Sequence, residues 1–493
     1  MRDPRFQPAP GGAASPTADA SATVNLPITP FGPGASADAP RRPSLVVNAV
    51  SNWLALATNI AIGVVLTPLL IQHLGKDGFG IWSLAGSIIG YYGMLHLGVA
   101  SAITPYTARY VGRNDWHGVG AVANTSLVMF TSIGVIVLIA AFALAAPLAA
   151  FFQVTGAQRV AFVHTVWLLG AAAAVAFPAK VFVSVVRAYE QYVPGNIVVI
   201  ASSLLRAVLT VLWLLQGKGL FGVALAVLIG DAVGLIANAW LCRRYAHHLR
   251  FHLAGAQWAM FRRLLLFGGT SVVIVVAETL RFNIDSIVIG RFVGLETVGV
   301  YAIAAVLVRY ANRSIRVVMK VLNPRFAVLY GAGDHDKLRA TLLRSLSVSS
   351  LLAFGGAALL IIIARPLIIF WVGDGFADAF LPLAILMAAL AFDFAQNPSI
   401  NFLYAADRIR PLAVLNVVEA LCNVTISLAL VSQYGMLGVA LGTAIPCIVL
   451  RLGALPRLVT RVINLPLAAY YARMLPAAAV AAAGVVAARW ALL

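Results

Sequence analysis

Four basic residues between positions 309 and 320 are spaced so that a helix would carry them on one face. Arg309, Arg313, Arg316 and Lys320 follow one another at steps of four, three and four residues, and such steps return to the same side of a helix. Arginine's planar fork of donors binds phosphate oxygens well, so the face could bind a diphosphate. Arg316 and Lys320 could instead be snorkelling cations that anchor a helix end.

Three further ionisable residues lie 24 to 31 positions before Arg309. Glu278, Arg281 and Asp285 are spaced three and four residues apart, so they could pair with one another along one helical face. A second interpretation is that Arg281 contacts a substrate while an acid couples transport to a cation or proton. Charges inside a membrane are costly and usually face a cavity or a partner.

Other apolar stretches also contain polar residues. Arg206 and Asp231 would both lie near mid-membrane and could pair with each other. Asp393 is a candidate for ion coupling or sugar binding, with asparagines one and two turns further on. Three asparagines near the start of the chain could bond sugar hydroxyls in the same cavity, or could join helices. The ion-coupling candidates are Asp393, Asp231, Glu278 and Glu419, and the substrate-binding candidates are Arg281, Arg309, Arg313, Asn48, Asn52 and Asn59.

The composition indicates an integral membrane protein. Hydrophobic residues make up 61% of the 493 residues and charged residues 11%, with a mean hydropathy of +0.92. A soluble domain is about 45–50% apolar and about 25% charged. The apolar runs are of the ~20-residue length that spans a bilayer as a helix and lack the alternation of a membrane β-barrel. The sequence therefore predicts an all-α membrane protein.

Twelve apolar runs and a weaker thirteenth supply the predicted spanning helices. They fall at about 45–72, 78–103, 120–150, 160–186, 195–215, 220–242, 264–290, 297–320, 341–364, 379–404, 411–432, 436–456 and 474–492. With the amino terminus in the cytoplasm, the cytoplasmic loops carry fifteen Lys or Arg and the opposite loops five. The positive-inside rule favours this orientation and explains most of the +18 net charge without nucleic acid.

One sharp turn between apolar runs is made twice. "LGKDGFGIW" at 74–82 and "VGLETVGVY" at 293–301 align with a shift of 219 residues, and "GLFGVALA" at 219–226 matches "GMLGVALG" at 435–442 with a shift of 216. We expect Gly75, Gly80, Gly294 and Gly299 to adopt backbone conformations that other residues resist. The aromatic residues that follow, Trp82 and Tyr301, are expected at the membrane interface.

The repeat predicts two six-helix bundles related by a parallel repeat. Substrate sites in such transporters lie between the halves, and the halves rock to alternate access. The predicted division is a disordered cytoplasmic tail at 1–42, bundles at 43–242 and 260–458, a cytoplasmic linker at 243–259, and an extension at 459–493 with a possible thirteenth helix.

The sequence also resembles a known family. "LTPLLIQHLGKDGFGIWSLAGSI" at 66–88 and "DSIVIGRFVGLETVGVYAIA" at 285–304 are similar to the corners of the polysaccharide flippases of the multidrug/oligosaccharidyl-lipid/polysaccharide exporter superfamily. The resemblance covers about 43–458. His96 stands where many members carry an acid, which puts any role of that acid in doubt here.

The resemblance implies a substrate and a location. The substrate would be an undecaprenyl-diphosphate-linked oligosaccharide, flipped from the cytoplasmic to the periplasmic leaflet of a bacterial inner membrane for O-antigen, capsule or exopolysaccharide biosynthesis. It also implies a cationic cavity. Partners would be this lipid-linked substrate, membrane lipids and possible polymerase and export machinery; neither nucleic acid nor a cofactor is expected.

Three alternatives remain open. A cation-coupled multidrug antiporter of the same superfamily should favour acids in its cavity, and a lipid II flippase should show fourteen clear helices. A membrane glycosyltransferase or polymerase would need an acid-x-acid metal motif, which "DHD" at 334–336 imitates on a short loop. No P-loop, HExxH or GxSxG motif is present, so we expect a transporter and not an enzyme.

Overall fold

The computed structural model describes residues 45–96, 99–252 and 255–492, which form one compact unit. The predicted tail at 1–42 lies outside the described residues. The first part of the chain forms α1 (Leu45–Tyr92), a short 3-10 turn (Gly93–His96), α2 (Val99–Gly112), α3 (Trp116–Phe151), α4 (Gly156–Ala188), α5 (Tyr192–Leu215) and α6 (Gly219–Tyr245).

The remaining helices begin after the basic loop. They are α7 (Trp258–Phe292), α8 (Leu295–Met319), α9 (Asn323–Gly331), α10 (His335–Val372), α11 (Phe380–Ala395), α12 (Asn397–Ala405), α13 (Ile409–Ile463) and α14 (Leu467–Leu492), with 3-10 turns at Lys320–Leu322 and Asp374–Ala379. Because α7 begins at Trp258, the predicted linker at 243–259 is partly helical. The predicted division into two bundles stays a prediction.

The helices are built for a membrane. Within the described ranges, nine helical segments are long and apolar enough to cross a bilayer, and the segment Leu467–Ala488 in α14 is one of them. No strand occurs among the described residues, which confirms the predicted all-α class. Neither α7 nor α8 is among the nine, and both carry charged side chains in mid-helix.

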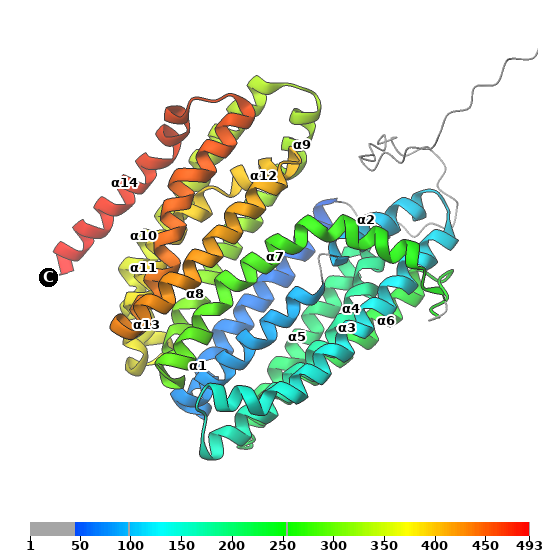
Figure 1. Ribbon diagram of the computed structural model, residues 1–493, viewed down its shortest axis with the longest axis horizontal. Helices are drawn as coiled ribbons and strands as arrows, with labels where there is room; N and C mark the ends of the chain where they lie inside the picture. The colour runs from blue at the N-terminus through cyan, green and yellow to red at the C-terminus, as the bar shows by residue number, and fades with distance from the viewer. Residues whose placement is uncertain (1–44, 97–98, 253–254, 493) are drawn as a thin grey trace, which may run out of the picture. The chain divides into compact units, whose positions relative to one another are not determined.

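Packing places α1, α7 and α8 together (Figure 1). α1 contacts α5, α7 and α8, while α7 packs along α13. α3, α4, α5 and α6 pack on one another. α11 packs on both α10 and α13. α14 lies on α10 (Figure 1).

Two predicted spanning runs are interrupted. The run predicted at 78–103 ends as α1, passes through a 3-10 turn and resumes as α2. The run predicted at 379–404 divides into α11 and α12 at Gln396, because Pro398 lacks the N–H that a continuous helix would use. The kinks inside α1 and α13 occur at Gly75 and Gly435, which both have positive φ.

Of the four glycines in the two copies of the repeated turn, two have the unusual backbone conformation that was expected of all four. Gly75 and Gly294 have φ of 69° and 129°, a region that favours glycine. Gly80 and Gly299 lie inside α1 and α8 and are not among the positive-φ residues, so the predicted conformational role is wrong for them. Tyr301 is buried and its hydroxyl donates to Asp285 at 2.6 Å; its predicted position at the membrane interface stays a prediction.

Candidate functional site

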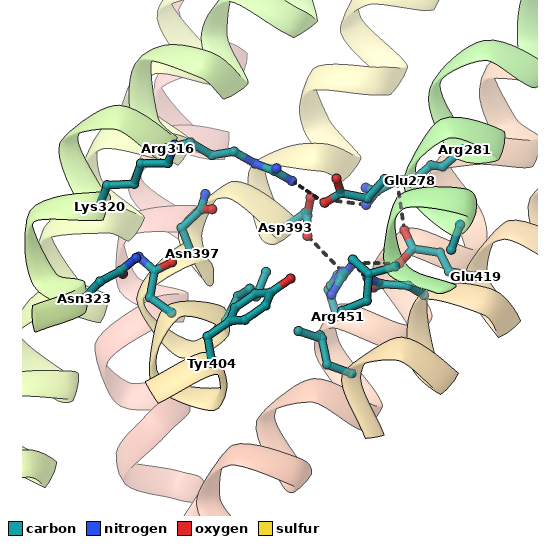
Figure 2. Close-up of a pocket in the computed structure, with 16 residues that line it drawn as sticks. Glu278, Arg281, Arg316, Lys320, Asn323, Asp393, Asn397, Tyr404, Glu419 and Arg451 are labelled. Carbon is teal, nitrogen blue, oxygen red and sulfur yellow. Dashed lines mark hydrogen bonds and ion pairs between the residues drawn. The ribbon is translucent and has the colours of Figure 1, made fainter. Parts of the chain in front are cut away.

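Four charged residues from three helices form a closed ring of ion pairs (Figure 2). Arg281 of α7 contacts Asp393 of α11 at 3.2 Å and Glu419 of α13 at 3.1 Å. Arg451, later in α13, contacts the same two carboxylates at 3.0 and 2.8 Å. Each arginine therefore neutralises both acids, and the ring joins α7, α11 and both limbs of α13.

The ring is almost completely removed from solvent. The four side chains are between 2% and 6% exposed. Burying a charge is expensive unless it is paired and hydrogen-bonded, and the ring balances two positive charges with two negative ones. Arg451 also donates to Asn416 at 3.2 Å, while its Nη1 has no hydrogen-bond partner in the described part of the chain. One buried donor thus remains free.

The ring forms one wall of a cavity of about 310 Å³. Figure 2 shows its side chains converging from α7, α8, α11, α12 and α13. Four cations and three carboxylates line it, so it carries one net positive charge: Arg281, Arg316, Lys320 and Arg451 against Glu278, Asp393 and Glu419. Five further polar side chains line it: Asn323, Asn397, Asn401, Tyr404 and Asn416.

The mouth of the cavity is more exposed than its wall. Arg316 donates to Glu278 at 3.1 Å, and these side chains are 37% and 38% exposed. Lys320 and Asn323 are exposed and lie near Arg316 (Figure 2). Solvated cations and the exposed Tyr404 at the mouth, with the buried Asn397 amide further in, could bind an anionic group that carries hydroxyls.

Polar residues on both sides of the break between α11 and α12 line the cavity. Asp393 precedes the break and Asn397 follows it. Gln396, at the break, is fully buried and its amide donates to the Arg451 carbonyl oxygen at 2.7 Å. The Tyr470 hydroxyl of α14 contacts Gln396 at 3.2 Å and Ser399 at 2.7 Å. The thirteenth predicted helix is therefore bonded to the back of the ion-pair ring.

We expect Tyr470→Phe to lower the free energy of unfolding by about 1–3 kcal/mol. The substitution keeps the shape of the aromatic side chain but removes the hydroxyl that donates to the buried Gln396 side-chain oxygen. An unsatisfied buried polar group costs about 1–3 kcal/mol. Thermal unfolding in detergent would measure it. Tyr434→Phe is the matched control, because Tyr434 is 56% exposed. Equal stabilities of the two variants would contradict the prediction.

The basic face of α8 divides at its middle. Arg316 and Lys320, for which a helix anchor was an alternative, line the cavity. Arg309 and Arg313 are exposed and are not among its lining residues. Their predicted role in substrate binding stays a prediction.

The three ionisable residues of α7 find partners on other helices. Glu278 pairs with Arg316 and Arg281 with Asp393 and Glu419. Asp285 accepts from Tyr301 and, at 3.1 Å, from Thr443. α7 packs along α13 and contacts α8, and the Arg281 side chain also reaches Asp393 of α11.

The predicted mid-membrane pair is present in the first part of the chain. Arg206 Nη2 lies 3.5 Å from Asp231 Oδ1. Asn52 and Asn59 accept hydrogen bonds from Asn196 and Ser203 of α5, at 2.9 and 3.1 Å.

These bonds join α1 to α5, in agreement with the alternative that the asparagines hold helices together. Asn48 is buried, and its Oδ1 has no hydrogen-bond partner in the described ranges. None of the three asparagines lines the cavity.

Sequence reasoning missed Arg451, the most consequential residue of the ring. Its signal was present, because it is a lone cation inside the apolar run at 436–456. Asn323, Tyr404 and Asn416 were also missed, and uncharged polar residues near helix ends give no comparable signal.

The "DHD" loop caps a helix. Asp334 is the N-cap of α10 and accepts from the Lys337 backbone N–H at 3.1 Å. Its pKa is lowered by its hydrogen bonds with the Lys337 side chain and backbone. Asp336 pairs with Arg339 at 3.2 Å. Both acids are therefore occupied in helix-end contacts, as expected of a solvated turn.

A bundle of long apolar helices around a charged cavity is the architecture of a multi-pass membrane protein. The sequence profile of the family described as polysaccharide biosynthesis protein matches residues 46–329, and the MatE profile matches residues 271–429. Because the first match covers more than half of the chain, the chain belongs to the polysaccharide biosynthesis protein family. The resemblance to polysaccharide flippases of the exporter superfamily is confirmed.

Individual relatives are distant but similar along most of their length. The chain is 19% identical over 406 residues to the "Putative O-antigen transporter" of Shigella flexneri, covering 82% of this chain and 94% of the relative. It is 22% identical over 433 residues to the "Uncharacterized membrane protein EpsK" of Bacillus subtilis (strain 168), covering 84% and 83%.

Solved structures share the fold. An inward-facing multidrug resistance MATE family transporter of the MOP superfamily matches with a TM-score of 0.70 and 16% identity, covering 84% of this chain and 98% of the other. The lipid II flippase MurJ in an inward closed conformation matches with a TM-score of 0.70 and 12% identity, covering 88% and 90%.

Proposed function

We propose that this chain flips an undecaprenyl-diphosphate-linked oligosaccharide across the bacterial inner membrane, from the cytoplasmic to the periplasmic leaflet, by alternating access. The product would feed the synthesis of O-antigen, capsule or exopolysaccharide. The observation that carries the proposal is the cavity's excess of positive charge, with Arg316 and Lys320 at its mouth. The printed name of the Shigella relative supports the same substrate class.

In this proposal the diphosphate binds at the mouth and the first sugar lies further in. Arg316 and Lys320 would bind phosphate oxygens through charge-assisted hydrogen bonds. Asn397, which is buried, offers an amide to sugar hydroxyls, and the exposed Asn323 and Tyr404 offer an amide and a hydroxyl nearer the mouth. The free Nη1 of Arg451 is a further donor. The acids Asp393 and Glu419 would couple transport to an ion, together with Glu278 and Asp231, whose arginine partners are more exposed.

A cation-coupled multidrug antiporter is a second candidate, favoured by the MatE match over residues 271–429. The ring weighs against it. Asp393 and Glu419 are each paired with two arginines, so a cationic drug would have to compete with guanidinium groups for them. Glu278 is likewise paired.

Deletion of the gene in the host bacterium tests the proposal. Under conditions where surface polysaccharide is made, lipid-linked oligosaccharide should accumulate in the cytoplasmic leaflet, because its exit is blocked. The wild-type gene should reverse the accumulation. Normal leaflet distribution, with altered sensitivity to cationic drugs, would favour the antiporter; accumulation of lipid II would favour a lipid II flippase.

A further inference from the structure

A second pocket lies where the first turn of α7 meets α3. Its volume is about 390 Å³, which falls within the range of about 300–1,000 Å³ that small-molecule sites occupy. Most of its lining is apolar, with Val128, Met129 and Ile133 from α3 and Trp258 and Phe261 from α7. No residue that lines it also lines the charged cavity, so the pocket is a separate site.

The loop before α7 is fastened to α3 beside the pocket. The Gln257 backbone N–H donates to the hydroxyl of Thr125, a lining residue, at 3.0 Å. The buried Asn124 amide donates to the Arg250 carbonyl oxygen at 3.2 Å, and its oxygen accepts from the His252 backbone N–H at 3.2 Å. The backbone of Arg250 is therefore held against α3, next to the pocket.

The first turns of α7 have a buried face and an exposed face. Met260 and Leu264 are buried in a cluster with residues of α2 and α3. Trp258 is 76% exposed and stacks on Phe261, with ring centroids 4.9 Å apart. Arg262 is exposed and follows Trp258 by four residues, which places it on the same side of the helix. An exposed aromatic surface and a cation thus lie next to each other at the pocket.

The chain around the pocket has positive charge and no acid to balance it. Residues 232–277 contain no Asp or Glu, and neither does α3. The same stretch has five arginines: Arg243, Arg244, Arg250, Arg262 and Arg263. All five are exposed, and none belongs to an ion pair within the described ranges. The charge at this end of the molecule is therefore complementary to an anion.

The apolar wall of the pocket continues along α3. Ile136 and Ile139 are 58% and 62% exposed. Together with the lining residues Val128 and Ser132 they follow one another at steps of four, four and three residues, and such steps return to the same side of a helix. A hydrocarbon chain that enters the pocket can therefore extend along α3 into the apolar interior of the bilayer.

We propose that this pocket binds an anionic phospholipid of the surrounding leaflet, with its phosphate on Arg250 and Arg262 and one acyl chain between α3 and the start of α7. Basic pockets between membrane helices bind anionic headgroups, and arginine forms charge-assisted hydrogen bonds with phosphate oxygens. Tryptophan is typical of the membrane interface, where a headgroup lies. The bound lipid fastens the loop before α7 to α3. This role goes beyond the proposed function and does not depend on which molecule is transported.

Photolabelling in lipid nanodiscs tests the site. Phosphatidylglycerol and phosphatidylcholine, each with the same photoreactive acyl chain, would be compared in separate samples, and labelled peptides identified by mass spectrometry. Phosphatidylglycerol should label the peptides with Met129 and Trp258 about tenfold more than phosphatidylcholine does, because only its headgroup has a net negative charge.

Two results of this comparison would overturn the proposal. Equal labelling by the two lipids would mean that the pocket is an apolar crevice with no headgroup recognition. Stronger competition by undecaprenyl diphosphate than by unlabelled phosphatidylglycerol would assign the pocket to a polyprenyl lipid instead. The leaflet distribution of lipid-linked oligosaccharide remains the separate test of the proposed substrate.

Removing the two cations tests headgroup recognition. Arg250→Gln with Arg262→Gln should reduce labelling by phosphatidylglycerol about tenfold, because the charge-assisted hydrogen bonds with the phosphate are lost. Arg408→Gln with Arg410→Gln is the matched control, because both residues are exposed cations near the start of α13, and it should be labelled like the wild type. Equal losses in the two double variants would show attraction by general charge and contradict a specific site.

Filling the pocket gives a second readout that leaves every charge in place. Ser132→Trp should also reduce labelling, because Ser132 is an exposed residue of the lining and the larger side chain occupies the space of the acyl chain. Thr131→Trp is its control, because Thr131 is exposed in the same helix but does not line the pocket. If the arginine variant does not fold, this pair decides alone, and equal labelling of the two tryptophan variants would refute the site.

Discussion

Arg451→Ala is expected to lower the free energy of unfolding by about 3–5 kcal/mol and to abolish transport. Arg451 contacts Asp393 at 3.0 Å and Glu419 at 2.8 Å, and its side chain is 2% exposed. Its removal leaves two buried carboxylates to share Arg281. Breaking a buried ion pair on one side is costly because the remaining charge has lost its partner and cannot reach water.

Transport should fail for a related reason. The ring forms a wall of the cavity, and without Arg451 the cavity's net charge changes from one positive to neutral. Asp393 and Glu419 would then repel an anionic group more strongly. The ring also joins α7, α11 and both limbs of α13, so its loss would loosen the cavity wall.

Thermal unfolding in detergent and transport in proteoliposomes would measure both effects. Arg457→Ala is the control, because Arg457 is an exposed arginine six residues further along α13, where surface changes stay within about 0.5 kcal/mol. Arg451→Met with Glu419→Met removes one charge of each sign and should recover stability without recovering transport. If Arg451→Ala unfolded like Arg457→Ala, the ring would not have the stabilising role inferred here.

The sequence predicts the helices of this chain well, because a membrane demands long apolar runs and these are visible in one dimension. The thirteenth run became part of α14. The positions of Asp393 and Glu419 inside apolar runs also marked them as functional candidates, and both line the cavity.

Partners across helices could not be predicted, because spacing along one helix says nothing about which helices touch. Glu278, Arg281 and Asp285 have the right spacing to pair with one another, yet other helices supply their partners. The basic face of α8 was predicted from spacing alone. Arg316 and Lys320 line the cavity whereas Arg309 and Arg313 do not, and only the packed structure distinguishes the two pairs.

The corner glycines show a similar limit. A glycine in a sequence signals either an unusual backbone conformation or a close approach. Gly75 and Gly294 serve the first purpose and Gly80 and Gly299 the second. The repeat revealed that the corner matters twice, but the contact between its two copies exists only in three dimensions.

Arg316→Gln combined with Lys320→Gln is expected to reduce transport of the lipid-linked oligosaccharide by about 100-fold or more. Hydrogen bonds to charged groups contribute about 1.5–3 kcal/mol each, and each factor of ten costs about 1.4 kcal/mol. The protein should remain folded, because the Arg316–Glu278 pair is more than a third exposed and contributes little to stability. Rates in proteoliposomes would measure the loss.

The control for this variant removes the same number of positive charges at positions outside the cavity. Arg325→Gln with Arg461→Gln also deletes two exposed cations, but neither lines the cavity. It should transport at close to the wild-type rate. Equal losses in the two double variants would mean that general positive charge attracts the substrate to the membrane surface, and that the cavity's mouth has no specific part in binding.

The Arg309→Gln and Arg313→Gln double variant, in the same assay, distinguishes a local binding site from a binding path along all four cations. If the diphosphate binds only at the cavity, this variant should retain more activity than the Arg316 and Lys320 variant, because neither Arg309 nor Arg313 lines the cavity. If all four cations contact the diphosphate in turn as it crosses, the two double variants should lose comparable activity. Since α8 runs from the second copy of the repeated turn to the cavity mouth, a binding path along all four cations would place the substrate's route along this helix.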